Sequence, residues 1–332
     1  MPENDVETIL EDITRRLVAL GELSHPHQLI THSHQGYNSR VYVLSSEKGE
    51  LVIHLAKPFE HYFTDKIWEK LLAVSTFLCK ETGLPISRII FAEPREGYVV
   101  SAQEKLPGDI AGTVAIIDHH VIYTWLQNKQ ILMPQVQRLL AEIHNLPIAG
   151  YGFPVEKNGA FVGTYTTWKE FLQERVQLWL NALRSGQGMR TLEENLYEEI
   201  TAYAAQFDWA STTFQGSLIH GDLGNPSNIL ADQERVMGII DWEFALVGDP
   251  AWEFCDEGWA ATVEETRLDA YFQARSIDSK EDREAFLRQI ILYRPLQCLM
   301  WLYVHRNDED PVIFDTCVAL LKKDLREAGQ WK

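Results

Sequence analysis

The sequence has few cysteines and no long hydrophobic segment. Its four cysteines are far apart and form no CxxC pair: Cys79, Cys255, Cys298 and Cys317. This spacing favours reduced thiols in a cytoplasmic protein over a disulfide framework or a zinc site. No segment reaches the roughly 18 consecutive apolar residues that a membrane-spanning helix needs. The acidic, amphipathic N-terminus also differs from a signal peptide. We therefore expect a cytoplasmic protein without a membrane span.

Basic residues are scarce relative to acidic ones. The chain has 30 Lys plus Arg against 48 Asp plus Glu, a formal net charge of −18. Nucleic acids and anionic membranes both need a cationic face, so neither is expected as the main partner. A neutral or cationic small molecule fits this charge better. The ordinary alternative is that the acidic surface serves solubility alone. The oligomeric state stays open.

The chain has 332 residues, 45% of them hydrophobic, which predicts two lobes or one large domain. Its first third alternates between helical and strand-like patterns. A first helix is expected over residues 1–23, with an apolar stripe of Ile9, Ile13, Leu17 and Leu20. A loop should follow, then two strands joined at Gly49, a helix ending at Gly83, and two more strands. The expected strands cover residues 39–44, 50–56, 87–93 and 97–106.

The strand signal nearly disappears after Gly108. Helices are expected over 134–146, 164–186, 193–207 and most of the chain from 262 onward. The segment 219–253 is the only clear β element of this half, so we expect it as a hairpin-like insertion. The predicted fold class is therefore α+β, with a small antiparallel-sheet lobe over residues 1–105 and a larger helical lobe over 106–332.

One segment concentrates the polar residues that chemistry requires: IHGDLGNPSNILADQERVMGIIDWEFALVGDPAWE, residues 219–253. Asp222 and Asp241 each follow an apolar strand, and Asn228 lies on the loop between them. If the two strands are neighbours, these three side chains meet at one point. A carboxylate and an amide oxygen are ligands that Mg²⁺ accepts together with phosphate oxygens, and the other aspartate can take a substrate proton. The ordinary alternative is that all three are turn residues.

The motifs HGDLGNPSN and IIDWEFALVGDPAWE resemble the catalytic segment of the aminoglycoside phosphotransferase family, relatives of the eukaryotic protein kinases. The resemblance extends over most of the chain and implies a kinase-like two-lobe fold. It also implies that Asp222 is the catalytic base, that Asn228 and Asp241 hold Mg²⁺, and that His220 braces the loop. Asp249 and Glu253 would anchor the helical lobe. The loop after Asp222 is one residue longer than in the family, so either Asn225 or Asn228 takes the ligand role; we favour Asn228.

The resemblance also implies nucleotide-binding residues in the first lobe. Gly36 is the single glycine of the expected phosphate loop, and His54 stands where the family has a phosphate-pairing Lys or Arg. Lys57 would point away from His54 because strand residues alternate between faces, unless the strand has already ended before Lys57. Glu69 is the expected partner of whichever cation serves. Backbone groups of Glu104 and Leu106 would face the adenine edge.

Two further clusters are candidates for binding. The closely spaced histidines suggest either a metal site or, as we favour, a solvated loop: His25, His27, His32 and His34. Asp256, Glu257 and Trp259 follow the catalytic segment. The carboxylates would bind ammonium groups and the indole would stack on a sugar ring, unless these residues form only an exposed acidic helix.

These observations predict a Mg²⁺- and ATP- or GTP-dependent enzyme that phosphorylates a hydroxyl group of a cationic aminoglycoside or aminocyclitol, such as hygromycin. Two alternatives remain. A metabolite kinase of the same superfamily, acting on choline, homoserine, methylthioribose or a fructosamine, would use the same catalytic segment. A nucleotide-binding pseudokinase would account for His54 and the lengthened loop.

Overall fold

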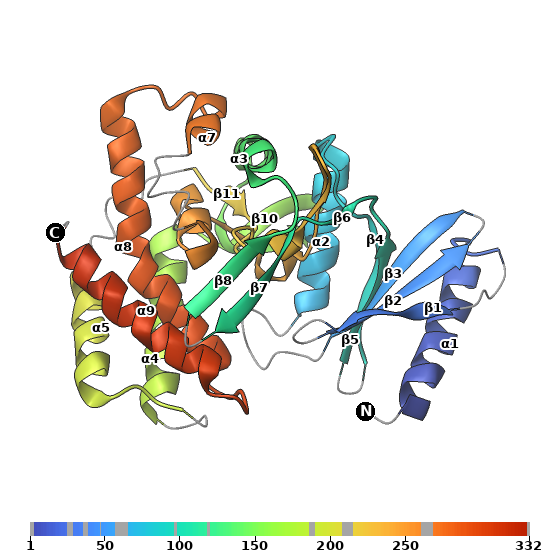
Figure 1. The fold of residues 1–332 in the computed structure, drawn as a ribbon, viewed down its shortest axis with the longest axis horizontal. Helices are drawn as coiled ribbons and strands as arrows, with labels where there is room; N and C mark the ends of the chain where they lie inside the picture. The colour runs from blue at the N-terminus through green and yellow to red at the C-terminus, as the bar shows by residue number, and fades with distance from the viewer. Residues whose placement is uncertain are drawn as a thin grey trace. The chain divides into compact units, whose positions relative to one another are not determined.

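The computed structural model describes residues 3–24, 29–35, 39–46, 48–56, 66–95, 98–117, 120–185, 190–207, 215–259 and 268–330. The chain divides into two compact units, Met1–Leu106 and Pro107–Lys332 (Figure 1). Within the described residues, no helix combines the length and the apolar character needed to cross a membrane. That the first unit binds nucleotide and the second carries catalysis stays a prediction at this point.

The first unit is a five-stranded antiparallel sheet with helices on both faces (Figure 1). The strand order is β1-β2-β3-β5-β4. Its elements are α1 (Glu3–Ala19), β1 (Leu29–Gln35), β2 (Ser39–Ser46), β3 (Gly49–Ala56), α2 (Ile67–Glu81), β4 (Ile89–Arg95) and β5 (Tyr98–Glu104). The strands expected after the first helix are present, and the residues of β2 and β3 are joined through a tight turn.

Strand β1 was not expected. It covers His32 and His34 of the histidine cluster, which we had assigned to a loop; His25 and His27 lie outside the described residues. The strand is polar and pairs only with β2, with irregular register at Ile30, His32 and His34. Polar composition and bulges are typical of edge strands, and they obscure the alternation by which a strand is found in a sequence.

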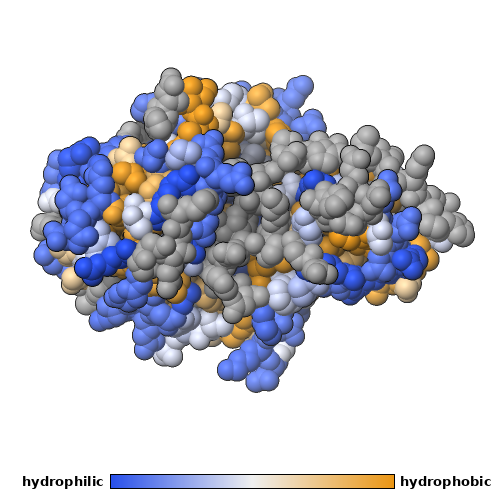
Figure 2. All heavy atoms as spheres, turned by 90° about the horizontal axis from the view of Figure 1, so that it is seen from below, coloured by the Kyte–Doolittle hydropathy of each residue, from blue (hydrophilic) through white to orange (hydrophobic). Residues whose placement is uncertain are grey.

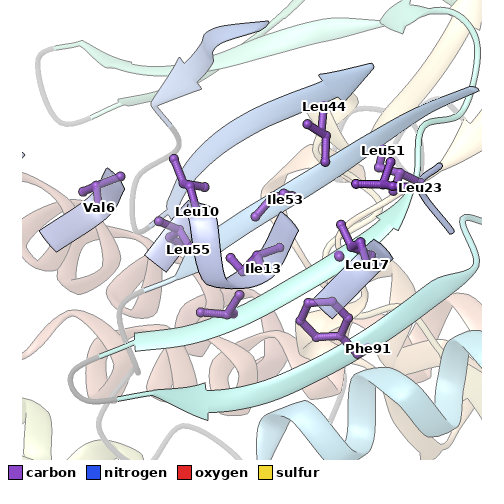
Figure 3. Close-up of a cluster of buried hydrophobic side chains, with 12 residues drawn as sticks. Val6, Leu10, Ile13, Leu17, Leu23, Leu44, Leu51, Ile53, Leu55 and Phe91 are labelled. Atoms are coloured by element: carbon purple, nitrogen blue, oxygen red, sulfur yellow. The ribbon is translucent and has the colours of Figure 1, made fainter. Parts of the chain in front are cut away.

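Helix α1 packs on one face of this sheet. Its buried residues interlock with Leu51, Ile53 and Leu55, the inward-facing residues of β3 (Figure 3). The buried stripe of the helix consists of Val6, Leu10, Ile13 and Leu17. The predicted stripe was therefore partly wrong, because Leu20 lies beyond the helix and is 53% exposed.

The second unit is built mainly from helices. They are α3 (Lys129–His144), α4 (Trp168–Ser185), α5 (Glu194–Gln206), α7 (Asp269–Ala274), α8 (Lys280–His305) and α9 (Val312–Gly329). Trp168 of α4 donates its indole N–H to the Tyr293 hydroxyl of α8 at 3.0 Å, and that hydroxyl donates to Asp249 at 2.9 Å. A buried hydrogen-bonded chain thus ties the two helices to the segment that follows the catalytic motif.

The second unit contains more β-structure than the sequence suggested. A four-stranded sheet has the order β10-β9-β14-β11, a three-stranded sheet has the order β13-β12-β6, and β7 and β8 form a separate hairpin. Their bounds are β6 (Asp109–Ile110), β7 (Gly112–Ile117), β8 (His120–Trp125), β9 (Tyr151–Lys157), β10 (Ala160–Tyr165), β11 (Ser217–Ile219), β12 (Ile229–Asp232), β13 (Arg235–Ile239) and β14 (Leu246–Gly248). The expectation of a single β insertion was wrong, because short hairpins were taken for connections.

Candidate active site

The catalytic loop begins where β11 ends. His220, Gly221 and Asp222 follow Ile219 directly, and the buried carboxylate of Glu253 holds the start of the loop. Its Oε2 accepts hydrogen bonds from the backbone N–H groups of His220 at 2.6 Å and Gly221 at 3.2 Å. Glu253 lies in the 3₁₀-helix η4 (Pro250–Phe254), which Asp249 caps through Ala251 N at 2.9 Å. The GDPAWE motif therefore fixes the backbone that presents Asp222.

Asn228 lies next to the Asp222 carboxylate. The loop after Asp222 contains a 3₁₀-helix, η2 (Pro226–Asn228), which Asn225 caps by accepting a hydrogen bond from Ser227 N at 3.1 Å. Asn228 Nδ2 donates to the backbone oxygen and to Oδ2 of Asp222, both at 2.8 Å. The side-chain oxygen of Asn225 accepts the capping hydrogen bond. The side-chain nitrogen of Asn228 points toward Asp222, so the side-chain oxygen of Asn228 points away from Asp222. The contacts thus favour Asn228 over Asn225 as the ligand.

Asp241 is brought to this loop by His220. The His220 ring is fully buried, and burial lowers its pKa to about 4, so the imidazole is neutral at pH 7. Its Nε2 lies 2.8 Å from the carbonyl oxygen of Ile240, and its ring centroid lies 4.6 Å from that of Trp242. A neutral ring that donates to this carbonyl braces the residues on either side of Asp241. These contacts favour a bracing role for His220, which stays a prediction.

Asp222 and Asp241 do not follow neighbouring strands, contrary to our expectation. Strand β11 pairs with β14, whereas β13, which precedes Asp241, pairs with β12 in another sheet. The aspartates are close enough for the Asp241 charge to raise the pKa of Asp222. What joins the two segments is the contact from His220 to Ile240, together with a backbone hydrogen bond of 3.0 Å from Ile240 N to Asn228 O.

Acidic groups surround Asp222. Burial, and then the charges of Asp256 and Asp241, raise its pKa well above the usual range, while hydrogen bonds from Asn228 and Asn225 act in the opposite direction. Like charges held close together each disfavour the ionised form of the others. A cation bound among these carboxylates would relieve that repulsion. The electrostatics therefore suit both a divalent metal ion and an ammonium group.

The donor set fits Mg²⁺. Asp241 is an exposed residue with φ of 68°, a conformation that Asp and Asn tolerate better than most side chains. Surrounding protein raises its pKa even though its surface stays accessible to an incoming ion. Within the described residues, no group of three His, Cys, Asp or Glu side chains could hold a metal by itself. Mg²⁺ commonly takes one or two protein oxygens and completes its shell with water and phosphate, so Asp241 and Asn228 are a sufficient pair.

A family model described as "Phosphotransferase enzyme family" matches residues 30–287. The chain belongs to this family. The predicted family and the predicted phosphotransferase class are therefore confirmed. Among curated proteins, the hygromycin-B 4-O-kinase of Escherichia coli is 26% identical over 123 residues, which are 34% of this chain and 33% of that protein. The chain thus matches about a third of the length of this relative.

Solved structures of similar fold include aminoglycoside phosphotransferases. The enzyme APH(4)-Ia superposes with a TM-score of 0.61 at 16% identity, over 95% of this chain and 99% of that chain. Aminoglycoside 2'-phosphotransferase-IIIa in its GDP complex gives a TM-score of 0.59 at 16% identity, over 90% and 93% of the two chains. Identities this low show the fold alone, and they confirm the two-lobe, kinase-like α+β fold.

In the first unit, this member of the phosphotransferase family has a histidine, His54, at the strand position where a phosphate-pairing Lys or Arg was expected. The side chain of His54 alternates with the buried Ile53 and Leu55, so it lies on the face of β3 opposite α1. Its Nε2 lies 3.2 Å from Gln103 Nε2. The residue keeps some accessible surface, yet desolvation lowers the pKa of His54 to about 4. A neutral ring can serve a phosphate only as a hydrogen-bond donor. Gly36 and Lys57 lie outside the described residues.

Two residues expected at the nucleotide site have partners within the first unit. Glu69 is exposed and pairs with Lys66 at 2.9 Å at the start of α2; its pairing with whichever cation serves the phosphates stays a prediction. The backbone N–H of Glu104 donates to Arg88 O at 3.0 Å, and its carbonyl accepts from the Ser87 hydroxyl. Because both backbone groups of Glu104 are engaged inside the first unit, Leu106 remains the candidate for the adenine edge.

The three residues expected to bind the acceptor differ in their burial and in their contacts. Asp256 is 6% exposed, and its Oδ1 accepts from Trp259 N at 3.0 Å; burial and the nearby Glu253 raise its pKa to about 7. Glu257 is partly exposed and lies 3.8 Å from Lys323. Trp259 is fully buried and packs edge-on against Phe254, with ring centroids 4.9 Å apart. The expected stacking of Trp259 on a sugar was therefore wrong, because the indole belongs to the core.

The sequence reasoning missed Tyr123, on strand β8. Burial raises its pKa well above the usual range, and the carboxylates of Asp256, Asp222 and Glu257 add to that shift. Its phenol therefore stays protonated. A signal was present: GTVAII and HVIYTW are two β-type runs separated by two residues, the spacing of a tight hairpin.

Proposed function

We propose that this enzyme transfers the γ-phosphate of ATP or GTP to a hydroxyl group of a cationic aminoglycoside or aminocyclitol, with hygromycin as the leading candidate. The observation that carries the proposal is the 2.8 Å hydrogen bond from Asn228 to the Asp222 carboxylate, next to the charge of Asp241. The acceptor class is supported by the curated relative named as a hygromycin-B kinase, and by a related fold solved with AMP-PNP and hygromycin B.

Asp222 would orient the acceptor hydroxyl and receive its proton. Asn228 donates to Oδ2 of this carboxylate and so helps to fix its orientation. As the hydroxyl oxygen bonds to the γ-phosphorus, the bond to the nucleoside diphosphate breaks and the proton passes to Asp222. Burial, the largest cause of the raised pKa of Asp222, favours this transfer because it makes the carboxylate a stronger base. Mg²⁺ held by Asp241 and Asn228 would neutralise charge on the phosphates.

Replacing Asp222 tests the catalytic assignment. Asp222→Asn keeps the size of the side chain but cannot accept the proton, so kcat for an aminocyclitol should fall by roughly a hundredfold or more. The measurement is nucleoside diphosphate release with a panel that contains hygromycin B, choline, homoserine, methylthioribose and a fructosamine. Asp232→Asn, at an exposed turn, is the matched control and should stay within about twofold of wild type. More than a few percent of kcat in Asp222→Asn would remove the residue from this role.

Replacing Asp241 tests the metal assignment. Asn tolerates the left-handed backbone at this position, so Asp241→Asn changes the charge with little backbone strain. We expect Mg²⁺ to tighten nucleotide binding to the wild type, and this gain to shrink by about tenfold or more in the variant. Nucleotide titrations with Mg²⁺ and with EDTA give both affinities. An equally large Mg²⁺ effect in the two proteins contradicts the assignment.

A further inference from the structure

A second buried carboxylate lies against the catalytic loop. Asp256 follows η4 directly after Cys255 and is 6% exposed. Its Oδ1 accepts a hydrogen bond from Trp259 N at 3.0 Å. The backbone N–H groups of Gly258 and Gly224 also donate hydrogen bonds to this carboxylate. One side chain therefore binds both the residues that follow it and the loop that carries Asp222.

The two segments lie close together because a glycine stands on each side of the contact. A Cβ added to Gly224 would lie 2.0 Å from Asp256 Oδ1, and a Cβ added to Gly258 would lie 2.2 Å from Gly224 O. Real Cβ atoms essentially never approach other atoms to within 3.0 Å. Glycine at both positions thus lets the loop backbone lie directly on the Asp256 segment.

Asp222 lies between two points at which the catalytic loop is held. Glu253 binds the two backbone N–H groups directly before it, and Asp256 binds that of Gly224, two residues after it. Both carboxylates are buried and belong to one segment, whose 3₁₀-helix η4 contacts β11 and α8. Two anchors on one support leave the residue between them little freedom to move.

Helix capping explains only part of these contacts. Residues 257–259 are helical, and the bond from Trp259 N to Asp256 is the ordinary bond of an N-cap, which Asn and Ser also make. The bond from Gly224 has no part in capping, because Gly224 belongs to a distant segment of the chain. The two roles can therefore be separated by the choice of substitution.

We propose that Asp256 is a positioning residue of the phosphoryl transfer, which holds the catalytic loop at Gly224 and so keeps the Asp222 carboxylate aligned with the acceptor hydroxyl. This inference rests on the proposed function and adds a residue that does not touch the substrate. It gives Asp256 another role than the acceptor contact that the sequence suggested. Small displacements of a catalytic group can cost on the order of a hundredfold in rate, so loosening this anchor should lower kcat.

Three substitutions of Asp256 separate the loop anchor from the helix cap. Asp256→Asn keeps the size and an acceptor oxygen, Asp256→Ser keeps the cap but is too short to reach Gly224, and Asp256→Ala removes both. With hygromycin B and nucleoside diphosphate release as the readout, kcat should stay within about fivefold of wild type in Asp256→Asn and fall about tenfold or more in the other two. Nucleotide Kd with Mg²⁺ should stay within about twofold in all three, because only alignment is lost. Asp315→Asn, at an exposed position of α9, is the control and should match the wild type.

A pair of glycine variants tests the same contact from the other side. Gly258→Ala places a methyl group against the backbone of Gly224 and should displace the loop, with a fall in kcat of about tenfold or more. Gly329→Ala, in α9, is the matched control because an added Cβ there has no neighbour within 4 Å. Its kcat should equal that of the wild type.

Each outcome decides a separate point. Wild-type kcat in a folded Asp256→Ser variant overturns the assignment. If Asp256→Ser does not fold, Asp256→Asn decides: kcat within about fivefold of wild type supports the anchor, and a larger loss overturns it because the acceptor oxygen is still present.

Hydrogen–deuterium exchange of residues 220–228 gives a readout that needs no activity. Exchange should be faster in Asp256→Ser than in the wild type and in Asp256→Asn, since the loop has lost one anchor. Equal exchange in all three proteins overturns the anchor. A wild type that phosphorylates none of the acceptors, yet shows this difference in exchange, rejects the proposed function and leaves the anchor in place.

Discussion

At the scale of single residues, buried carboxylates with raised pKa values dominate this site. Glu253 is the most deeply placed of them, with no exposed surface and with one oxygen bound to the backbone of His220 and Gly221. Its other oxygen, Oε1, has no hydrogen-bond partner among the described residues. Burial, more than any neighbouring charge, raises its pKa from 4.5 to about 8. The protonated form is thus the favoured one in the folded protein.

This raised pKa predicts a pH-dependent stability. A group with a higher pKa in the folded state stabilises fully below its unfolded pKa, here 4.5, and loses that contribution as the pH rises through about 8. The amide introduced by Glu253→Gln does not ionise, so the free energy of unfolding of the wild type relative to this variant should fall between about pH 5 and pH 8.5. The expected fall is on the order of 2–4 kcal/mol.

Urea unfolding of both proteins at the two pH values measures this difference. Glu198→Gln, at an exposed position of α5, is the control and should change the unfolding free energy by less than about 0.5 kcal/mol at either pH. A difference between wild type and Glu253→Gln that stays constant, or grows with pH, would mean that the carboxyl is already ionised in the folded protein.

At the scale of elements, helix α1 shows how packing selects one stripe from several that a sequence allows. Ile9 and Leu20 have the right spacing to extend the apolar face, but the buried residues are Val6, Leu10, Ile13 and Leu17. Helix α1 ends at Ala19, so Leu20 lies outside the helix and its side chain is exposed to solvent. The sheet beneath α1 therefore decides which of the possible apolar faces becomes core.

This difference predicts unequal effects for two leucines three residues apart. Leu17 has no exposed surface and is packed in the core of the first unit, so Leu17→Ala should lower the free energy of unfolding by about 2–4 kcal/mol. Leu20→Ala removes the same atoms from a side chain that is 53% exposed and should cost less than about 0.5 kcal/mol. Urea unfolding monitored by circular dichroism compares them. Equal losses would show that Leu20 is buried in solution.

At the scale of the whole molecule, the excess of acidic residues agrees with a cationic ligand. The coloured surface in Figure 2 is mostly hydrophilic, with scattered hydrophobic patches. A net charge of −18 raises the local concentration of cations around the protein and repels anionic polymers. The nucleotide is itself an anion, so a protein of this charge needs Mg²⁺ or local donors to bind it. The proposed Mg²⁺ ligands Asp241 and Asn228 would meet this requirement.

The sequence by itself determined the catalytic motif, the family and the two-lobe fold. These follow from local order: His220, Asp222 and Asn228 lie on one short loop, and most helices show their period directly. Only the tertiary structure decided which strands are neighbours, which tryptophans are buried and where the β7–β8 hairpin packs. Trp259 and Tyr123 illustrate the reason. Burial and charge at a side chain depend on residues far away in the chain, so local pattern could not place Trp259 in the core or show that distant carboxylates raise the pKa of Tyr123.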